Sequence, residues 1–392
     1  MDHKVQETTN ASSRHYDYII AGAGAAGLSL LVRILRSGKL SSKKILLLDQ
    51  EVKNKNDRTW CFWEKGTGFF EEIVYRKWQT LWFHGKDFSR KLDIAPYQYK
   101  MIRGIDFYSY CLNIIGKAEN VTIRYGKVTQ LYGNGLETWV LVDNERFTAE
   151  YIFNSIILDR PIPKPGEYHL LQHFKGWIIN TEIPVFDIKE ATLMDFRVDQ
   201  QQGASFVYVM PFSTTRALVE YTVFSEKVLS QHEYEERLIQ YINTFNCGAY
   251  EREDEEFGVI PMTNQAFPRR TGNIIYMGTA GGQTKASSGY TFQFIQKSTA
   301  AIVDAFPDNA FTPGPDKKFD FYDSVLLNVL ATGKVSGDQI FTLLFKKNLP
   351  QSIFSFLDNE SSFFEDLKII SSLPTLPFLQ AGLQQISMHR HR

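Results

Sequence analysis

Apolar positions along this chain follow a strand period in some stretches and a helix period in others. Short apolar runs at 17–21 and 44–49 predict two buried strands. Between them, apolar residues from Leu28 to Leu35 recur at helical spacing. The N-terminal region therefore predicts a strand–helix–strand unit of the kind that forms parallel sheets.

The turn between the first strand and the helix carries G-x-G-x-x-G at Gly22, Gly24 and Gly27. The first glycine permits a tight turn, the second lets the backbone approach a pyrophosphate, and the third lets the helix pack close to the strand. Asp49 ends the second strand, where an acid accepts a hydrogen bond from a ribose. We predict an adenine-dinucleotide site for FAD or NAD(P); the alternative is a turn that only packs a helix onto a sheet. Its predicted residues are Gly22, Ala23, Gly24, Ala26, Gly27 and Asp49.

A second glycine-rich turn follows the predicted strand at 273–277, and Ser288 is predicted to open the next helix. Amides at such a helix start can hold a pyrophosphate or a ring carbonyl. Two such turns separated by a β-rich region are what a two-domain FAD fold needs, whereas a single NAD-binding domain does not need the second. The predicted cofactor residues here are Gly278, Thr279, Ala280, Gly281, Gly282, Gly289 and Tyr290.

The remaining pattern predicts the domain organisation. Alternating runs predict a hairpin within 80–94, single strands at 121–131 and 138–147, and four strands between 171 and 224. After Thr312 the pattern is helical, with dense Phe and Leu that could dock on a bilayer or pack as a cap on the domain. The predicted FAD-binding segments are 1–78, 104–162 and 263–310, the substrate-domain segments are 79–103 (a hairpin) and 163–262, and the helical C-terminal region is 311–392. The fold class is α/β, a Rossmann-like FAD-binding domain with a β-sheet substrate domain and this helical region.

Composition narrows the possible partners and the compartment. The 392 residues carry 43 Lys and Arg against 44 Asp and Glu, a net charge of −1, so no nucleic-acid partner is implied. Three scattered cysteines are typical of a reducing compartment such as the cytoplasm, and no cluster indicates a metal site. The N-terminal stretch lacks the apolar core of a secretory signal, and no segment approaches the length of a membrane span.

Candidate chemistry lies in one loop and two strands. Arg58 precedes a Trp/Phe cluster and could lie near the charged parts of a flavin, with the aromatics as a pocket wall; the alternative is an aromatic cluster under a loop. Glu220 shares a strand face with apolar residues, so burial is expected to raise its pKa and make it a usable general acid. Asp195 is a second carboxyl of this type. For each acid, the alternative is a solvated outward carboxylate.

These residues resemble the bacterial-type lycopene β-cyclases, flavoproteins that close the ends of lycopene into rings. The resemblance extends in order over essentially the whole chain. The matching stretches are Asp17–Leu30, Arg58–Trp63, Leu171–Trp177, Thr192–Phe196, Phe206–Phe212, Leu218–Thr222, Thr284–Phe292, Leu343–Pro350 and Leu373–Leu379. Two positions depart from the family pattern: a loop proline is lost within Lys285–Tyr290, and Tyr221 stands where an acid is common. Both departures bear on ring specificity.

The resemblance implies a function. Glu220 carries over as the catalytic carboxylate, with Asp195 as a second candidate, in an isomerase-type (intramolecular lyase) cyclisation of lycopene to β-carotene via γ-carotene. Reduced FAD is the implied cofactor and NADPH the reductant, with no net redox change; whether Glu220 or a flavin nitrogen delivers the proton is left open. The cysteines indicate a cytoplasmic protein, and the insoluble substrate implies that it attaches peripherally to a membrane. The expected substrate-binding residues are Trp60, Phe62, Trp63, Phe206 and Tyr208.

Rival functions share the glycine turns. An FAD-dependent monooxygenase or an isoprenoid reductase acting on an apolar substrate would consume NAD(P)H in proportion to product, whereas a cyclase needs only catalytic reductant. A non-catalytic carotenoid carrier would have no use for two cofactor turns.

Overall fold

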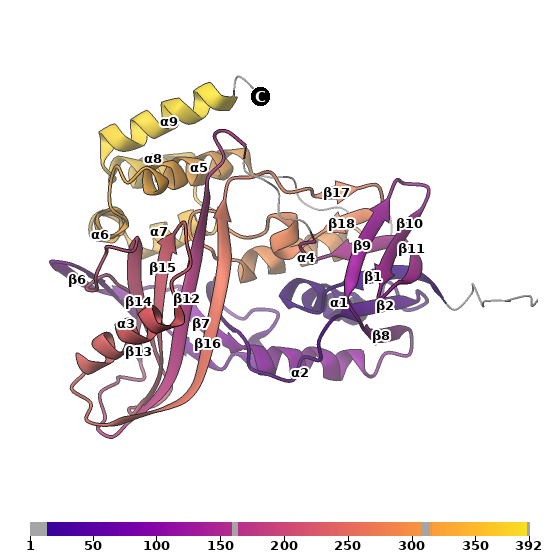
Figure 1. Cartoon of the computed structure of the whole chain (residues 1–392), viewed down its shortest axis with the longest axis horizontal. Helices are drawn as coiled ribbons and strands as arrows, with labels where there is room; N and C mark the ends of the chain where they lie inside the picture. Colours follow the sequence, from indigo (N-terminus) through magenta and orange to yellow (C-terminus); the bar gives the residue numbers. More distant parts are fainter. Residues whose placement is uncertain (1–13, 159–163, 307–313, 315, 390–392) are drawn as a thin grey trace, which may run out of the picture.

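The computed structural model describes residues 14–158, 164–306, 314 and 316–389. The N-terminal sheet has eight strands, of which β18, β11, β1, β2 and β8 are parallel neighbours. Its strands are β1 (His15–Ala21), β2 (Ile45–Asp49), β8 (Val121–Tyr125), β9 (Val128–Gly133), β10 (Thr138–Val142), β11 (Glu145–Asn154), β17 (Arg270–Thr271) and β18 (Ile274–Tyr276). Figure 1 shows this sheet on the right of the molecule.

Helices cover one face of this sheet and a β-hairpin covers the other. The helices are α1 (Ala25–Ser37), α2 (Gly104–Ile115) and α4 (Phe292–Asp304), which pack with β1 and β18 in one apolar core. A second core lies between the opposite sheet face and β9–β10. Gly27 makes the close packing possible, since a Cβ there would collide with the Gly22 carbonyl oxygen. The predicted βαβ unit is thus confirmed.

The second sheet has seven strands in the order β16-β12-β15-β14-β13-β5-β6 (Figure 1). They are β5 (Thr80–Gly85), β6 (Phe88–Asp93), β12 (His169–Thr181), β13 (Glu190–Asp195), β14 (Ala204–Pro211), β15 (Arg216–Ser225) and β16 (Tyr250–Thr263). One face packs under α3 (Gln231–Asn243), which begins with a capping box at Ser230 and Glu233. The other face carries the largest apolar core and turns toward the rest of the chain.

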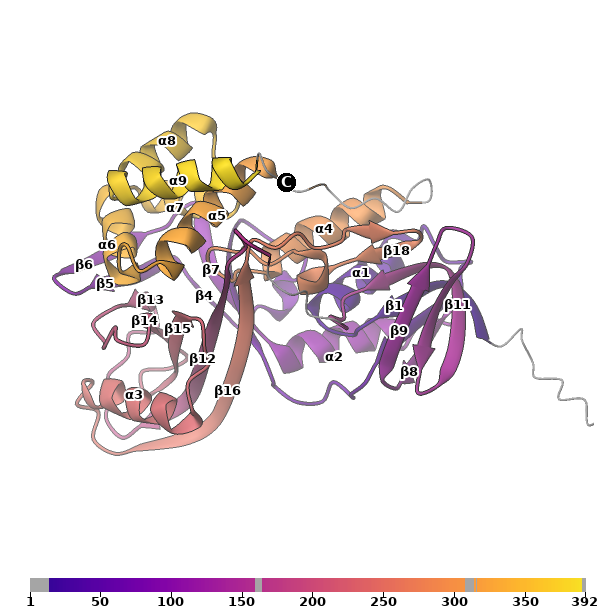
Figure 2. The same ribbon diagram turned by 45° about the horizontal axis from the view of Figure 1, so that its top comes forward.

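Smaller elements connect these two bodies. A three-stranded sheet of β3 (Thr59–Lys65), β4 (Arg76–Trp78) and β7 (Tyr97–Arg103) joins them, with short 3₁₀ turns η2 (Glu71–Ile73) and η3 (Gly278–Gly281). The C-terminal helices sit above the seven-stranded sheet (Figure 2). They are α5 (Lys317–Ala331), α6 (Gly337–Lys347), α7 (Pro350–Leu357), α8 (Phe363–Ser371) and α9 (Thr375–His389). No helix in the described part of the chain is long and apolar enough to cross a bilayer.

The predicted fold class is confirmed, with three local corrections. The stretches 121–131 and 138–147 are not single strands, because the first is interrupted at 126–127 and the second by a turn at 143–144. Asp143 and Asn144 adopt positive φ in this turn, which separates β10 from β11. The helix expected to open at Ser288 begins only at Phe292. The division into domain segments stays a prediction, and its boundaries at 162–163 and 310–311 lie outside the described residues.

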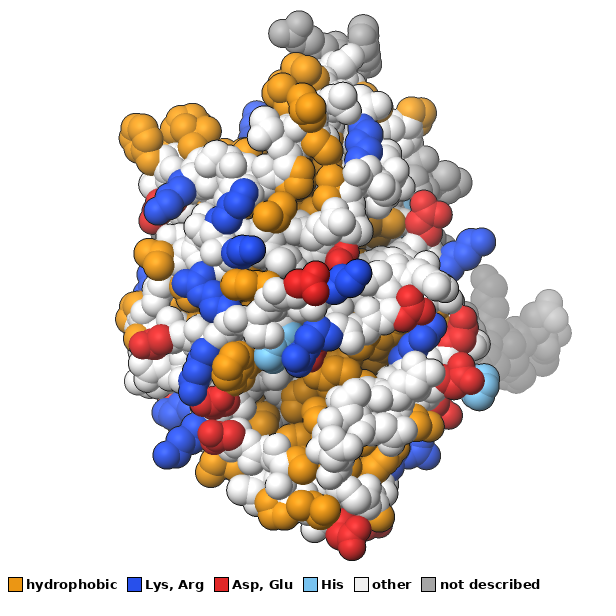
Figure 3. Space-filling model, turned by 90° about the vertical axis from the view of Figure 1, so that its left-hand side faces the viewer, with side chains coloured by type: hydrophobic (Ala, Val, Ile, Leu, Met, Phe, Trp, Pro, Cys, Tyr) orange, Lys and Arg blue, Asp and Glu red, His pale blue; other side chains and the backbone are white. Residues whose placement is uncertain are grey.

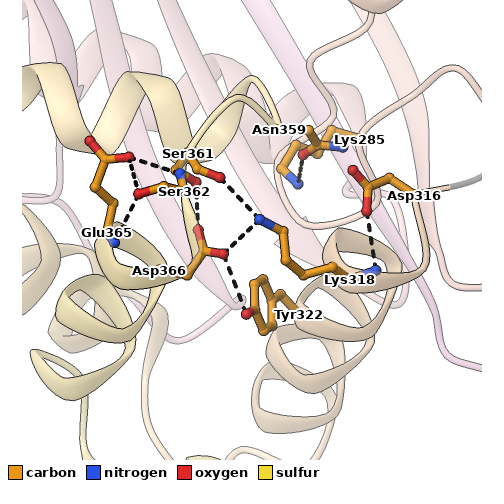
Figure 4. A network of polar contacts seen from close by, with 9 residues as sticks. All are labelled: Lys285, Asp316, Lys318, Tyr322, Asn359, Ser361, Ser362, Glu365 and Asp366. Atoms are coloured by element: carbon orange, nitrogen blue, oxygen red, sulfur yellow. Dashed lines mark hydrogen bonds and ion pairs between the residues drawn. The ribbon is translucent and has the colours of Figure 1, made fainter.

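A buried polar network ties the second glycine-rich turn to the C-terminal helices (Figure 4). The Lys285 ammonium contacts Asp323 Oδ1 on α5 at 2.8 Å and donates to the Asn359 amide oxygen at 2.8 Å. Ser287 donates to the same Asp323 oxygen at 2.7 Å. Nearby, Lys318 contacts Asp366 at 2.8 Å, which links α5 to α8. Lys285, at the start of the loop Lys285–Tyr290, therefore anchors this loop to the C-terminal region.

We predict that Lys285→Met lowers the free energy of unfolding by about 3 kcal/mol, because it leaves the buried Asp323 carboxylate without its cation. Thermal melting measures the change. The matched control is Lys317→Met, an exposed lysine at the start of α5, whose effect should stay within about 0.5 kcal/mol. Equal melting temperatures for the two variants would contradict a stabilising role for the Lys285 pair.

Candidate functional site

A cavity of about 600 Å³ lies where the glycine turns of the N-terminal sheet face the seven-stranded sheet. Gly22 and Gly24 line it from the first turn, Asp49 from the end of β2, and Gly278 and Thr279 from the second turn. Strands β12, β14, β15 and β16 contribute the opposite wall, which includes Gln172, Tyr208, Leu218, Glu220, Glu256 and Ile260. The fold thus brings both predicted glycine turns and the predicted acid Glu220 to one cavity.

The first turn has the geometry of a nucleotide cradle. Gly22 adopts a φ of +101°, which favours glycine, and a Cβ at Gly24 would meet no atom within 4 Å, so the backbone there is open. Ala23 donates its backbone N–H to Asp49 Oδ2 at 2.7 Å, and Lys53 contacts Asp49 Oδ1 at 3.1 Å. The carboxylate at the end of β2 is therefore held at the cavity wall. Ala26 also lines the cavity, whereas Ala23 and Gly27 shape the turn behind it.

The second turn presents fewer residues to the cavity than predicted. Gly278 and Gly289 adopt positive φ, and Gly278, Thr279, Gly289 and Tyr290 line the cavity. The Gly278 N–H donates to the Gln283 side chain at 2.7 Å, which holds the turn. The other three predicted positions lie behind the lining and form the 3₁₀ turn and its end: Ala280, Gly281 and Gly282. The roles of these residues in cofactor binding stay predictions.

Three of the five predicted substrate-binding aromatics are core residues. Trp60 and Tyr208 line the cavity, together with Arg58 from the loop before β3. Phe62 stacks on Phe292, with ring centroids 4.6 Å apart. Trp63 and Phe206 are buried in the large apolar core. Alternation along β3 does not separate these residues, because Cys61 shares the face of Trp63 and yet lines the cavity. Tyr99 and Tyr290 also line the cavity, and sequence reasoning had not assigned Tyr99.

Glu220 lies half-buried on the cavity face of β15. In the sheet register it stands directly opposite Tyr208 on β14 and Gly176 on β12. Thr222 Oγ1 donates to Glu220 Oε1 at 3.0 Å. Burial, and then the neighbouring Glu256 carboxyl, raise the pKa of Glu220 well above its ordinary value. The predicted rise in pKa is confirmed, so this carboxyl holds its proton more tightly than a solvated glutamate does.

Glu256 on β16 is a cavity carboxyl that the sequence reasoning missed. Burial raises the pKa of Glu256 above its ordinary value, although Thr59, Glu220 and Arg58 act to lower it. The segment Glu251–Glu256 is a run of charged residues, and such runs are typical of exposed strands. The other five members are indeed exposed, and only Glu256 turns to the cavity. Strand alternation within 250–263 was the signal that could have identified it.

Asp195 lies on the opposite side of the sheet, and the raised pKa expected for it is wrong. Its carboxylate accepts two side-chain hydrogen bonds from Arg197, at 2.9 and 2.7 Å, and one from the Tyr241 hydroxyl of α3 at 2.8 Å. Burial acts to raise the pKa of Asp195, but these partners outweigh it and hold the pKa below its ordinary value. Tyr221, the other departure from the family pattern, also faces the α3 side.

With this geometry established, comparison with known proteins identifies the family. The family described as "Lycopene cyclase protein" matches residues 17–383, so the chain belongs to the lycopene cyclase family. The chain is 24% identical over 308 residues to a chloroplastic neoxanthin synthase of Solanum lycopersicum, covering 72% of this chain and 58% of that protein. It is 25% identical over 225 residues to the lycopene beta-cyclase of Pantoea ananas, covering 53% of this chain and 52% of that protein. The chain thus spans little more than half the length of these relatives.

Solved flavoprotein structures share the fold. A geranylgeranyl bacteriochlorophyll reductase-like protein from Thermoplasma acidophilum superposes with a TM-score of 0.54 at 13% identity, covering 95% of this chain and 96% of that one. A probable FAD-dependent monooxygenase from Pseudomonas aeruginosa gives a TM-score of 0.51 at 13% identity, covering 91% of this chain and 100% of that one. These likenesses concern the fold alone, so chemistry has to be argued from the site.

We predict that Asp195→Asn destabilises the protein by about 1 kcal/mol at pH 7, since the Arg197 side chain is half-exposed and solvent weakens the pair. Because the folded-state pKa lies below the ordinary 3.8, the contribution is present above that pH and is lost as pH falls through the folded-state pKa. Thermal melting at pH 7 and near pH 3 measures it. A stability difference that grows at low pH would contradict this account.

Proposed function

We propose that this chain is a flavin-dependent lycopene β-cyclase, which converts the ψ-ends of lycopene into β-rings and gives β-carotene via γ-carotene. The observation that carries this proposal is the carboxyl of Glu220, which has a raised pKa and lines the same cavity as both glycine turns. Family membership supports a carotenoid substrate.

The cavity residues fit an adenine dinucleotide that carries a polar ring system, and we propose that FAD is the cofactor bound there. The backbone at Gly22 and Gly24 would face the pyrophosphate, Asp49 the ribose, and the turn at Gly278 and Gly289 the flavin end. The buried amide oxygen of Gln172 lines this cavity and has no hydrogen-bond partner among the described residues, so it is available to a donor on a bound ring. When bound in its reduced form, FAD would supply negative charge close to a developing cation. NADPH is the proposed reductant.

The side chains supply the acid and the surroundings for a carbocation. The proton of the Glu220 carboxyl bonds to a carbon of the terminal double bond, which leaves a tertiary cation. The neighbouring double bond attacks this cation and closes the ring, and loss of a ring proton to a carboxylate of the cavity completes an isomerisation without net electron transfer. The aromatic faces of Trp60 and Tyr208 line the cavity, where they can stabilise the cation by cation–π attraction. The apolar wall, with Leu218 and Ile260, presents no nucleophile that would quench it.

We predict that Glu220→Gln lowers the conversion of lycopene more than about 100-fold, because the general acid is lost. The measurement is the chromatographic pigment profile of lycopene-accumulating cells that express the chain. The wild-type profile should shift to β-carotene or to the one-ringed intermediate, which also shows how many ends react.

The matched control is Asp195→Asn, which removes a carboxylate on the other face of the same sheet and should leave most of the conversion. Flavin absorbance of the purified variants checks that cofactor is still bound. Full conversion by a flavin-loaded Glu220→Gln enzyme would disprove the acid role. Unchanged lycopene with wild-type protein, together with stoichiometric NAD(P)H consumption on another isoprenoid, would favour a reductase or monooxygenase.

We also propose that the protein is cytoplasmic and attaches peripherally to a membrane through α8 and α9. The apolar residues of α6 and α7 are mostly buried, as expected for helices that pack on the domain as a cap. By contrast, α8 and α9 expose large apolar side chains. These are Phe363, Phe364, Leu367, Leu376, Leu379, Leu383 and Ile386. Figure 3 shows apolar side chains over the upper part of this end of the molecule, with Lys and Arg among and below them. Exposed Lys346 and Lys368 supply charge that suits anionic lipid.

We predict that Phe364→Ser with Leu376→Ser weakens binding to phosphatidylcholine–phosphatidylglycerol vesicles at least tenfold, since burying one large apolar side chain contributes about 1.5–3 kcal/mol. Co-sedimentation measures the bound fraction. The control is Leu136→Ser with Ile188→Ser, two exposed apolar residues outside these helices. Equal binding of both double variants, or loss of a dimer rather than of vesicle binding, would contradict the proposal.

A further inference from the structure

Two carboxyl groups meet across a single glycine in the cavity wall. Strand β12 runs between β15 and β16, and its residue Gly176 pairs with Glu220 on one side and Glu256 on the other. Residues paired in this way point to the same face of a sheet, and the two glutamate Cα atoms are then about 10 Å apart. Both side chains line the same cavity. The register therefore places two glutamates from different strands on the same face of the sheet, on either side of Gly176.

Gly176 leaves open the space in which these side chains meet. A Cβ at this position would lie 3.3 Å from the Glu220 Cβ and 3.2 Å from the Glu256 Cγ, and 2.9 Å from a methyl carbon of Leu218. A larger residue would push the two glutamate stems apart. Glycine in a strand interior marks a place where other groups must approach closely. Here those groups are the two glutamate side chains, which flank Gly176 on the same face of the sheet.

The groups that face the pair from other elements are mostly neutral. They are Cys61 on β3, Tyr99 on β7, Tyr208 on β14 and Tyr290 before α4. Burial raises the pKa of each of these four groups, so none of them carries charge near neutral pH. The charged groups that act on Glu256 are Arg58 and Asp254, of opposite sign. In this surrounding, two adjacent carboxylates would repel each other strongly, so a single shared proton is the stable arrangement.

We propose that Glu220 and Glu256 form a proton-sharing carboxyl pair across Gly176, in which Glu256 is the positioning residue that keeps Glu220 in its acid form. The inference rests on the proposed function for the use of that acid in catalysis. The pair itself is a property of the fold. Glu256 acts through Glu220: its negative charge opposes ionisation of the neighbouring carboxyl, and its oxygen accepts the shared proton.

The first test is the pH profile of lycopene conversion by purified, flavin-loaded Glu256→Gln. A neutral amide no longer opposes ionisation of Glu220, so the pKa of Glu220 falls and conversion is lost at lower pH than in the wild type. We expect the alkaline limb to move down by about one pH unit or more, with conversion retained below it. Glu256→Asp restores the charge and should restore part of the shift. Glu251→Gln removes an exposed acid from the same strand and should leave the profile unchanged.

A second variant separates the carboxyls without removing either. Gly176→Ala places a methyl group between the two stems, so its alkaline limb should move in the same direction as that of Glu256→Gln. Thermal melting and flavin content check that the variant is folded and loaded. A merely structural role for Glu256 would lower conversion equally at every pH and would not be reproduced by Gly176→Ala.

Infrared spectroscopy measures the protonation of the two carboxyl groups without requiring turnover. At neutral pH the wild type should show a protonated-carboxyl band that disappears in Glu220→Gln and weakens or shifts in Glu256→Gln. If this band behaves as expected but the wild type converts no lycopene, the proposed function fails and the pair stands. An unchanged pH profile together with an unchanged band in Glu256→Gln would overturn the pair.

Discussion

Desolvation of carboxyl groups is the constraint on which the site depends. A carboxyl taken out of water loses the hydration that stabilises its charge, and its proton is held more tightly as a result. In this protein the loss is produced where two sheets line one cavity, with Glu220 on the wall opposite the glycine turns. The acid strength of that group is therefore a property of the assembled molecule.

Several features keep the cavity walls in place. Gly27 lets α1 approach β1 closely, which fixes the first turn at the cavity edge. The buried Lys285–Asp323 pair ties the second turn to the C-terminal helices that cover the far part of the seven-stranded sheet. This is the loop in which the resemblance to the family implies a lost proline. The ion pair holds it through a tertiary contact.

The same fold serves unlike chemistries in the solved flavoproteins that it resembles, which include a reductase-like protein and a probable monooxygenase. A fold of this type brings a dinucleotide turn close to a β-sheet wall, and the residues on that wall decide the reaction. A wall that carries two adjacent carboxyls among aromatic side chains is suited to proton delivery and to a cation. It is less suited to a redox reaction that needs neither.

The sequence alone determined the local elements of this protein, because hydrophobic period and glycine spacing are properties of neighbouring residues. It predicted the βαβ unit, the second glycine turn, the strand that carries Glu220 and the helical C-terminal region. It misjudged the pKa of Asp195, since alternation tells which residues share a face but not which face meets the cavity. Phe62 shares a strand face with Trp60, and Phe206 with Tyr208, so only the packing around each strand decided which of these rings line the cavity. The meeting of Glu220 with Glu256 was decided only by the tertiary structure, because it depends on the register of strands that are far apart in the chain.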